Sequence, residues 1–295
     1  MKKGCLLLLA ALLLTASVGG AEKLYLREFS APEDAAYLNL ERLQKIDYDQ
    51  LVAYLAQFPN LTRVDMYDSP VSAAQADELT ALFPKITFGW TIRIPCKDHN
   101  HDIRTDATAF STLHNKRSPQ LTSDDFRCLR YCKKLLALDL GHNRLTDLDF
   151  LYDLPNLRVL IIAINQVTDI TPLASLHDLE YAELFNNRIA DLTPLSGLTK
   201  LLDLNLSFNA IADWTPLWPL QKLERLWLYS SSTRGPGSKA LSDEVLQGLR
   251  EHLPGAYIDS THYPTTGGWR DHARYEVIHS MFSSGVYQPF DGGEN

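Results

Sequence analysis

The sequence predicts an α/β fold, a right-handed solenoid with short parallel strands on its concave face and short helical turns on its convex side. Two observations predict it. Asparagines recur every 22 residues, at Asn143, Asn165, Asn187 and Asn209. In addition, 26 of the 50 leucines of this 295-residue chain fall between residues 135 and 228. Because one such turn is too small to enclose a core, successive turns must stack and share their leucines.

The strands and corners follow from an L-x-x-L-x-L-x-x-N-x-L pattern around each asparagine, which is typical of leucine-rich repeats. Aliphatic residues lie eight before, three before and two after each asparagine: Leu135, Leu140, Leu145; Leu157, Ile162, Val167; Leu179, Leu184, Ile189; Leu201, Leu206, Ile211. An asparagine side chain both donates and accepts hydrogen bonds, so it can satisfy backbone groups at the corner of a coil. We therefore expect a structural asparagine ladder that seals one edge of the core.

The helical turns follow from the repeated segment Asp-x-Thr-Pro-Leu at 169–173, 191–195 and 213–217. Threonine before proline favours an N-cap followed by the first helical residue. The same coils carry an acidic column: Asp147, Asp169, Asp191 and Asp213. Because like charges so close repel each other, these aspartates either accept bonds from turn amides, which we favour, or share a cation.

Residues 135–230 resemble bacterial leucine-rich repeat proteins of the internalin-like class, whose repeats are 22 residues long. Three further segments resemble exported leucine-rich repeat proteins of gut Firmicutes: Gly141-His142-Asn143, Phe150-Leu151 to Ile161, and the tail from Tyr275 to Phe290. The resemblance implies a solenoid and implies no established biochemical activity.

Four regions are predicted: a signal peptide at 1–21, a divergent repeat-like region at 22–106, regular repeats at 107–234, and a C-terminal cap and tail at 235–295. We expect helices at 47–57, 72–83, 123–131 and 242–252, and strands at 86–94 and 257–258. In the tail, Tyr275, Ile278, Met281 and Phe282 share one helical face. This face predicts a lid over the last coil; the alternative is a docking helix for a partner.

The first residues predict export. Lys2 and Lys3 precede an apolar run from Cys5 to Leu14, and Gly19-Gly20-Ala21 ends the segment, as in a secretory signal peptide. An uncleaved anchor is the alternative. Cleavage would take the formal charge from −8 to −10, and no second apolar stretch is long enough to span a membrane. We therefore expect a secreted or cell-surface protein.

Export would place three cysteines, Cys96, Cys128 and Cys132, in an oxidising compartment. Buried thiols are expected, with a disulfide from Cys96 to one of the others as the alternative. The composition, 45% apolar and 22% charged, excludes a disordered chain, and the acidic balance argues against a nucleic-acid partner. The chain has no Gly-x-Ser-x-Gly, His-Glu-x-x-His or phosphate-loop motif, so no catalytic residue and no cofactor is predicted.

One segment offers an alternative function, a metal site. Cys96, His99 and His101 could ligate a transition metal, and 98–102 resembles the start of a calcium loop. The calcium pattern fails because Ile103 and Ala109 replace its glycine and glutamate. A solvated loop is favoured over a metal-assisted hydrolase centred on 96–102.

The strand positions between the inward leucines point onto the concave face. They form an expected ligand-binding band that no core requires: Ile161, Tyr181, Glu183, Phe185, Asp203, Phe208, Trp227 and Tyr229. Aromatic anchors with interspersed charge are typical of recognition surfaces. The alternative is that a tail or loop of the same chain covers this band.

The sequence therefore predicts a non-catalytic, secreted binding module that recognises a protein or peptide through its concave face, with basic partners favoured by its negative charge. Two alternatives stay open besides the hydrolase. A glycan could stack on the aromatic rings, or the solenoid could act as a surface spacer.

Overall fold

The computed structural model describes residues 23–26, 29–41, 47–96, 100–112, 121–229, 241–265 and 268–290. The predicted signal peptide lies outside the described residues. The chain forms two compact units, the first comprising Met1–Ser69 and Leu79–Phe88 and the second Pro70–Glu78 and Gly89–Asn295. No helix among the described residues has both the length and the apolar character needed to cross a membrane.

The first unit contains a hairpin, a parallel strand pair and a helix. Strands β1 (Lys23–Leu26) and β2 (Phe29–Pro32) are antiparallel, and β3 (Tyr37–Asn39) pairs in parallel with β4 (Arg63–Ser72). Helix α1 (Tyr48–Leu55) begins where Asp47 accepts a hydrogen bond from the Gln50 N–H at 3.0 Å. This helix confirms the expected one at 47–57, and it buries Leu51, Tyr54 and Leu55.

The second unit contains a seven-stranded parallel sheet, with neighbouring strands one coil apart. Its strands are β7 (Ala109–Ser111), β8 (Ala137–Asp139), β9 (Val159–Ile161), β10 (Tyr181–Glu183), β11 (Asp203–Asn205), β12 (Arg225–Trp227) and β13 (Tyr257–Asp259). From β8 to β12 each residue pairs with the residue 22 positions away. The predicted solenoid is thereby confirmed.

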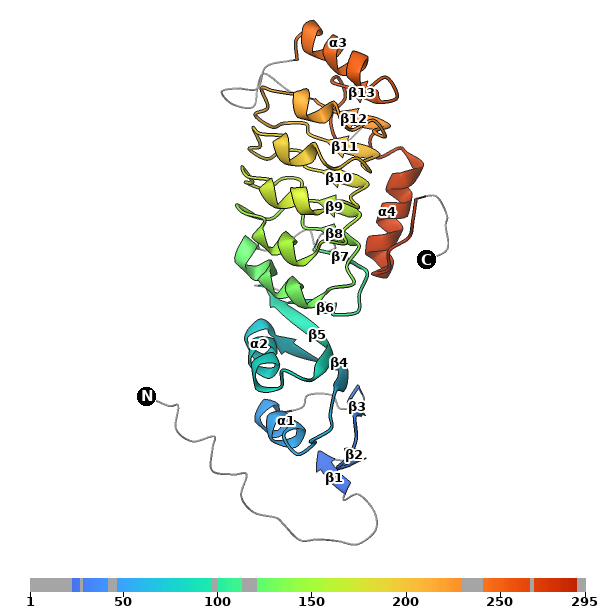
Figure 1. Cartoon of the computed structure of the whole chain (residues 1–295). Helices are drawn as coiled ribbons and strands as arrows, with labels where there is room; N and C mark the ends of the chain where they lie inside the picture. Colours follow the sequence, from blue (N-terminus) through green and yellow to red (C-terminus); the bar gives the residue numbers. More distant parts are fainter. Residues whose placement is uncertain are drawn as a thin grey trace, which may run out of the picture. The chain divides into compact units, whose positions relative to one another are not determined.

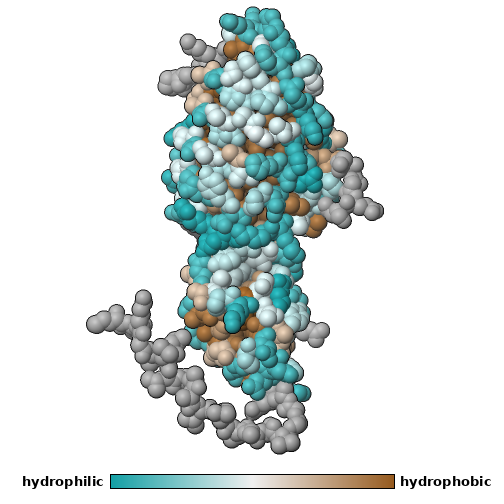
Figure 2. Space-filling view, viewed as in Figure 1, coloured by the Kyte–Doolittle hydropathy of each residue, from teal (hydrophilic) through white to brown (hydrophobic). Residues whose placement is uncertain are grey.

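The return segments form short 3-10 helices on the opposite side of the coils from α4 (Ala273–Ser284) (Figure 1). They are η1 (Ser123–Tyr131), η2 (Asp149–Asp153), η3 (Thr171–Ser175), η4 (Thr193–Leu195) and η5 (Thr215–Leu217). In Figure 2 hydrophilic residues cover most of the visible face of this unit, whereas hydrophobic residues gather around α1 on the first unit. The turns therefore face solvent.

The expectation that threonine is the N-cap of these turns is wrong. The N-cap positions are Ile170, Leu192 and Trp214, and the aspartate just before each of them bonds the first amide of the turn. Asp169 Oδ1 accepts the backbone N–H of Thr171 at 2.8 Å, and Asp191 and Asp213 make the same bond in the next two coils. An aspartate two residues ahead reaches the amide more directly than a threonine that already has helical geometry. Three of the four aspartates in the acidic column thus accept backbone amides, as expected.

The asparagines join neighbouring coils. Asn187 Oδ1 accepts the N–H of Val167 at 3.1 Å, and its Nδ2 donates to the carbonyl oxygens of Ile162 and Leu184 at 2.9 and 3.0 Å. Asn165 and Asn209 bond in the same way, one coil apart, and Asn143 differs only in donating to the Thr112 hydroxyl in place of the carbonyl of the preceding coil. Each side chain therefore satisfies backbone groups that strand pairing leaves free.

We expect Asn187→Ala to lower the free energy of unfolding of the second unit by roughly 2–3 kcal/mol. The change leaves one buried N–H and shared carbonyl oxygens without their partner, and each orphaned group costs about 1–3 kcal/mol. Urea unfolding measures the loss. Asn156→Ala, at an exposed asparagine, is the control and should stay within about 0.5 kcal/mol of the wild type.

The flanking elements agree with most expectations. Helix α2 (Ala73–Leu82), strand β5 (Thr87–Pro95), helix α3 (Asp243–His252) and strand β13 lie where they are predicted. Strand β6 (Asn100–Arg104) pairs antiparallel with β5. The helix expected at 123–131 is present as the 3-10 helix η1.

The three described cysteines are free thiols, and no disulfide joins Cys96 to Cys128 or Cys132. Burial raises the pKa of Cys128 to about 11 and that of Cys132 further still. Both therefore act as small apolar groups inside the first coils.

Candidate functional site

The C-terminal segment, residues 268–290, lies across the concave face of the sheet. It contains α4, whose residues contact β7 and β8 (Figure 1). Trp269, Ile278, Met281 and Tyr287 of this segment are at most 1% exposed and pack in one cluster with residues of β7 to β12. Burying side chains of this size contributes roughly 1.5–3 kcal/mol each.

This position corrects the expectation that the tail closes the last coil. The last coil is contacted by α3, where His252 stacks on Trp218 with ring centroids 3.7 Å apart. The apolar face of α4 instead meets the outward apolar residues of the strands, among them Val159 and Ile161. The apolar residues of the helix and of the concave face are thereby removed from water together.

The expectation that the concave band is exposed is therefore wrong for six of its eight residues. Ile161, Tyr181, Glu183, Phe185, Asp203 and Trp227 are at most 6% exposed. For these six residues the alternative prediction is correct, because a segment of the same chain covers them. Phe208 and Tyr229 remain half-buried.

A buried ion pair anchors the C-terminal segment. Arg225 binds Asp203 with two hydrogen bonds, Nε to Oδ1 at 2.8 Å and one terminal nitrogen to Oδ2 at 2.9 Å. The other terminal nitrogen of Arg225 donates to the Trp269 carbonyl at 3.0 Å, and its guanidinium lies over the Trp269 ring, 4.5 Å from the centroid. Arg274 adds a further bond to Asp203 Oδ1 at 2.7 Å and an ion pair with Glu224.

Backbone contacts hold the far end of the same segment. The Ala109 N–H donates to the Gly285 carbonyl at 3.2 Å, and the Tyr287 N–H donates to Thr108 Oγ1 at 2.9 Å. Gly285 ends α4 with a φ of 72°, a conformation that glycine adopts without strain. The chain can therefore turn back along β7.

Two carboxyl groups are buried below the C-terminal segment. Asp139 and Glu183 occupy the same register position on β8 and β10, with Ile161 of β9 between them. Asp139 accepts the Gly141 N–H at 3.0 Å and the Ser111 hydroxyl at 2.9 Å. Burial raises the pKa of Asp139 to about 7 and also raises that of Glu183.

Three aromatic rings form the aromatic cluster: Phe208, Tyr229 and Tyr263. Their centroids are 5.2, 5.5 and 5.9 Å apart, and all three pairs meet edge to face. Tyr263 is 39% exposed. Phe208 has a φ of 55°, and His142, Ile164 and Asn186 share this left-handed conformation in the preceding coils. The backbone conformation at this corner is therefore the same in all four coils, and the fourth coil has an aromatic side chain there, Phe208.

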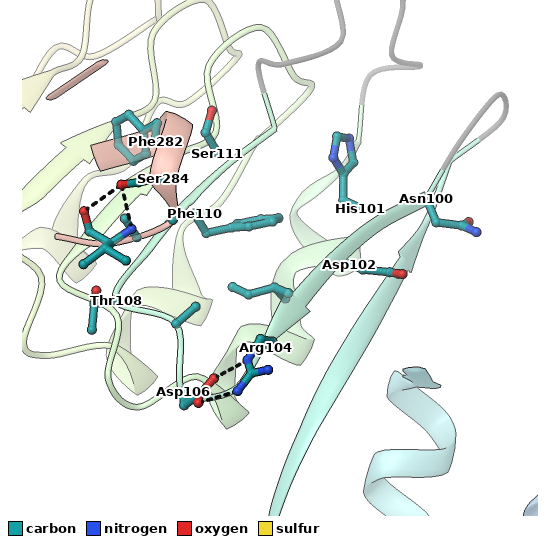
Figure 3. Close-up of a pocket in the computed structure, with 15 residues that line it drawn as sticks. Asn100, His101, Asp102, Arg104, Asp106, Thr108, Phe110, Ser111, Phe282 and Ser284 are labelled. Carbon is teal, nitrogen blue, oxygen red and sulfur yellow. Dashed lines mark hydrogen bonds and ion pairs between the residues drawn. The ribbon is translucent and has the colours of Figure 1, made fainter. Parts of the chain in front are cut away.

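A wide, shallow pocket of about 660 Å³ lies between β6 and the end of α4 (Figure 3). Its charged residues are already paired: Arg104 binds Asp106, and Asp102 accepts two hydrogen bonds from Arg93 at 2.7 and 2.8 Å. His101 and Asp102 belong to the segment proposed as a metal site, of which 97–99 lie outside the described residues. Among the described residues, no group of three histidine, cysteine or acidic side chains is arranged to hold a metal ion.

The site residues that the sequence analysis missed belong mainly to the C-terminal region: Tyr263, Trp269, Arg270 and Arg274. No repeat pattern marks them. One signal was available, because Asp203 and Arg225 lie 22 residues apart in one column, where opposite charges on adjacent coils must meet.

Residues 133–175 match the family model described as leucine-rich repeats (2 copies). The fold and this match define the class of the protein as a leucine-rich repeat solenoid. No curated protein matches the chain in sequence.

Among solved structures, internalin C2 of Listeria monocytogenes is 26% identical over 70% of this chain and 73% of its own, with a TM-score of 0.41. Internalin F of the same species is 22% identical over 70% of this chain and 65% of its own, with a TM-score of 0.43. The Arabidopsis receptor kinase HAESA, solved with a peptide hormone and a co-receptor, is 19% identical over 66% of this chain and 26% of its own, with a TM-score of 0.32.

Proposed function

We propose that this protein is a non-catalytic, exported binding module that recognises a protein or peptide at the aromatic cluster of Phe208, Tyr229 and Tyr263. The observation that carries the proposal is the partial exposure of three interlocked rings at the edge of the concave face. Aromatic side chains supply large contact area at low entropic cost, and they dominate binding energy at protein interfaces.

The solenoid itself does not require these rings. One coil before Phe208 the equivalent residue is Asn186, which has the same positive φ, and one coil before Tyr229 the equivalent residue is Ser207. The leucine columns and the asparagine ladder hold the coil in both cases. The aromatic residues are therefore an addition to the repeat, as expected of residues that serve recognition.

Two properties of the whole chain support the remaining parts of the proposal. The pattern at residues 1–21 supports export, and the formal charge of −8 favours a basic partner. The buried members of the predicted band, such as Tyr181 and Trp227, seat the C-terminal segment and are not proposed to meet the partner.

The double variant Phe208→Asn, Tyr229→Ser gives each position the residue that occurs one coil earlier and tests the proposal. Peptides selected from a random-sequence display library on the wild-type protein should bind the variant at least tenfold more weakly, because both anchoring rings are lost. Fluorescence anisotropy with the selected peptides measures the change. Asparagine tolerates a positive φ, so the unfolding midpoint should stay within a few degrees of the wild type.

Tyr152→Ser, at an exposed tyrosine on η2, is the matched control and should leave peptide binding unchanged. Equal binding of the selected peptides to wild type and double variant would overturn the proposal. Failure to enrich any peptide, with ring-dependent binding to a glycan array instead, would replace the protein ligand by a sugar.

A further inference from the structure

A small cavity of about 160 Å³ lies between the strands β8 to β10 and helix α4. Its apolar wall includes Ile161, Phe185, Ile278 and Phe282, and the exposed His279 lies at its rim. A cavity of about 150 Å³ accommodates a molecule the size of benzene. The cavity therefore has room for roughly six to nine non-hydrogen atoms of a ligand.

Glu183 lines this cavity, and one of its two carboxylate oxygens accepts no hydrogen bond from the described residues. Glu183 is 1% exposed, and its Oε1 accepts both of its hydrogen bonds, from Trp269 Nε1 at 2.8 Å and from the Tyr181 hydroxyl. Its second oxygen, Oε2, accepts none from the described residues. This oxygen is therefore available to a donor from a bound molecule.

Asp139 adds a second carboxyl to the same cavity. It occupies the same register position two strands away, about 10 Å from Glu183 along the sheet at a strand spacing of ~4.8 Å. Neither carboxyl forms an ion pair with any described arginine, lysine or histidine, whereas Asp203 at the other end of the face has two arginine partners. The cavity lining therefore contains two carboxyl groups and one arginine, Arg270.

Arg270 also lines the cavity and supplies a donor. It lies near enough to both carboxyls to lower their pKa, and its ring neighbour is Tyr275, 5.2 Å from the guanidinium. Its Nε is buried and has no hydrogen-bond partner. The cavity thus presents an unused acceptor and an unused donor, walls of aliphatic and aromatic carbon, and space for a few heavy atoms.

We propose that this cavity binds an α-ammonium group and its neighbouring carbonyl or carboxylate oxygen, as carried by a small aliphatic amino acid or by the first residue of a peptide. The ammonium group donates to Glu183 Oε2 and is attracted by Asp139. The oxygen accepts from Arg270 Nε, and the aliphatic side chain lies against Phe185 and Ile278. One ligand thereby satisfies both unused polar groups.

Isothermal titration calorimetry on the full chain with L-alanine, L-valine and the dipeptide Ala-Ala tests this site. Binding of valine or of the dipeptide is expected, and N-acetyl-valine, which lacks the ammonium group, should bind at least tenfold more weakly. Stronger binding of the dipeptide identifies the peptide N-terminus as the ligand, and binding of the free amino acids alone identifies those. Binding of none of the three, or equal binding of the acetylated compound, overturns the proposal.

Glu183→Gln provides the residue-level test. Glutamine retains an acceptor for Trp269 and Tyr181 but places an amide in the cavity, so affinity should fall at least tenfold. Glu244→Gln on α3 makes the same charge change at an exposed site and should have no effect. Retained affinity in Glu183→Gln overturns the assignment of this residue. The inference is independent of the aromatic cluster, since Phe208→Asn, Tyr229→Ser should leave amino-acid binding unchanged.

Discussion

Replacing Asp203 by alanine is expected to lower the free energy of unfolding of the second unit by about 3–5 kcal/mol. The Asp203 carboxylate is fully buried and accepts hydrogen bonds from two arginines, Arg225 and Arg274. The Arg225 side chain is only 7% exposed, and alanine would leave its guanidinium without a carboxylate partner. The cost arises chiefly from this unpaired buried charge and only in part from the lost attraction.

The same substitution is expected to loosen the C-terminal segment. Arg225 connects Asp203 to the Trp269 carbonyl, and Arg274 connects it to the start of α4. Without Asp203, limited proteolysis should cut the chain between residues 260 and 275 faster than in the wild type. Urea unfolding and the cleavage rate are independent measurements of the same anchor.

Asp178→Ala is a matched control, because the Asp178–Lys200 pair also joins residues 22 positions apart on adjacent coils. Both side chains of that pair are at least half exposed, so its loss should cost less than about 1 kcal/mol. A cost for Asp203→Ala as small as that of the control would show that the Asp203 cluster does not hold the segment.

The repeats were predictable because each coil packs only against the coils before and after it. Each coil must place its leucines and its asparagine at fixed offsets to join the next coil, so the same spacing occurs four times in the sequence. The 22-residue spacing of Asn143 to Asn209 therefore predicts strands, corners and register together. The cap of the turns was misassigned because Asp and Thr recur with equal regularity, and only geometry distinguishes which oxygen reaches the amide.

The cover of the concave face was not predictable in the same way. Ile278 and Met281 lie in a single helix of 12 residues that does not recur in the chain, so no repeated spacing predicts where this helix packs. The sequence did contain both partners, an apolar helix face and an apolar band at Ile161, Tyr181 and Trp227. Two unpaired apolar surfaces in one chain can cover each other, and their pairing depends on a long-range contact that local patterns do not encode.

The Asp139→Asn variant is expected to become more stable than the wild type as the pH rises. Burial raises the pKa of Asp139 from its ordinary value of 3.8 to about 7. Between these values the unfolded chain releases the Asp139 proton while the folded chain retains it, so the wild type loses stability with rising pH. A shift of this size corresponds to about 4 kcal/mol across the window, at about 1.36 kcal/mol for each unit.

Asparagine cannot ionise, and its side chain can still accept the Gly141 N–H and bond Ser111. The two proteins should therefore differ little at pH 4, where the aspartate is protonated in the folded state and about two-fifths protonated in the unfolded chain. At pH 8 the variant should be more stable by up to about 4 kcal/mol. Urea unfolding at pH 4, 6 and 8 measures the difference, and the same difference at all three values would contradict the prediction.

Asp169→Asn should show the opposite sign. Asp169 is exposed on the convex side, and its hydrogen bonds from Thr171 lower its pKa, so ionisation there favours the folded state. The Asp169→Asn protein should match the wild type at low pH and be less stable at pH 8. Opposite pH responses from two aspartates of the same solenoid would show that the surroundings of Asp139, and not the general charge of the protein, determine its protonation.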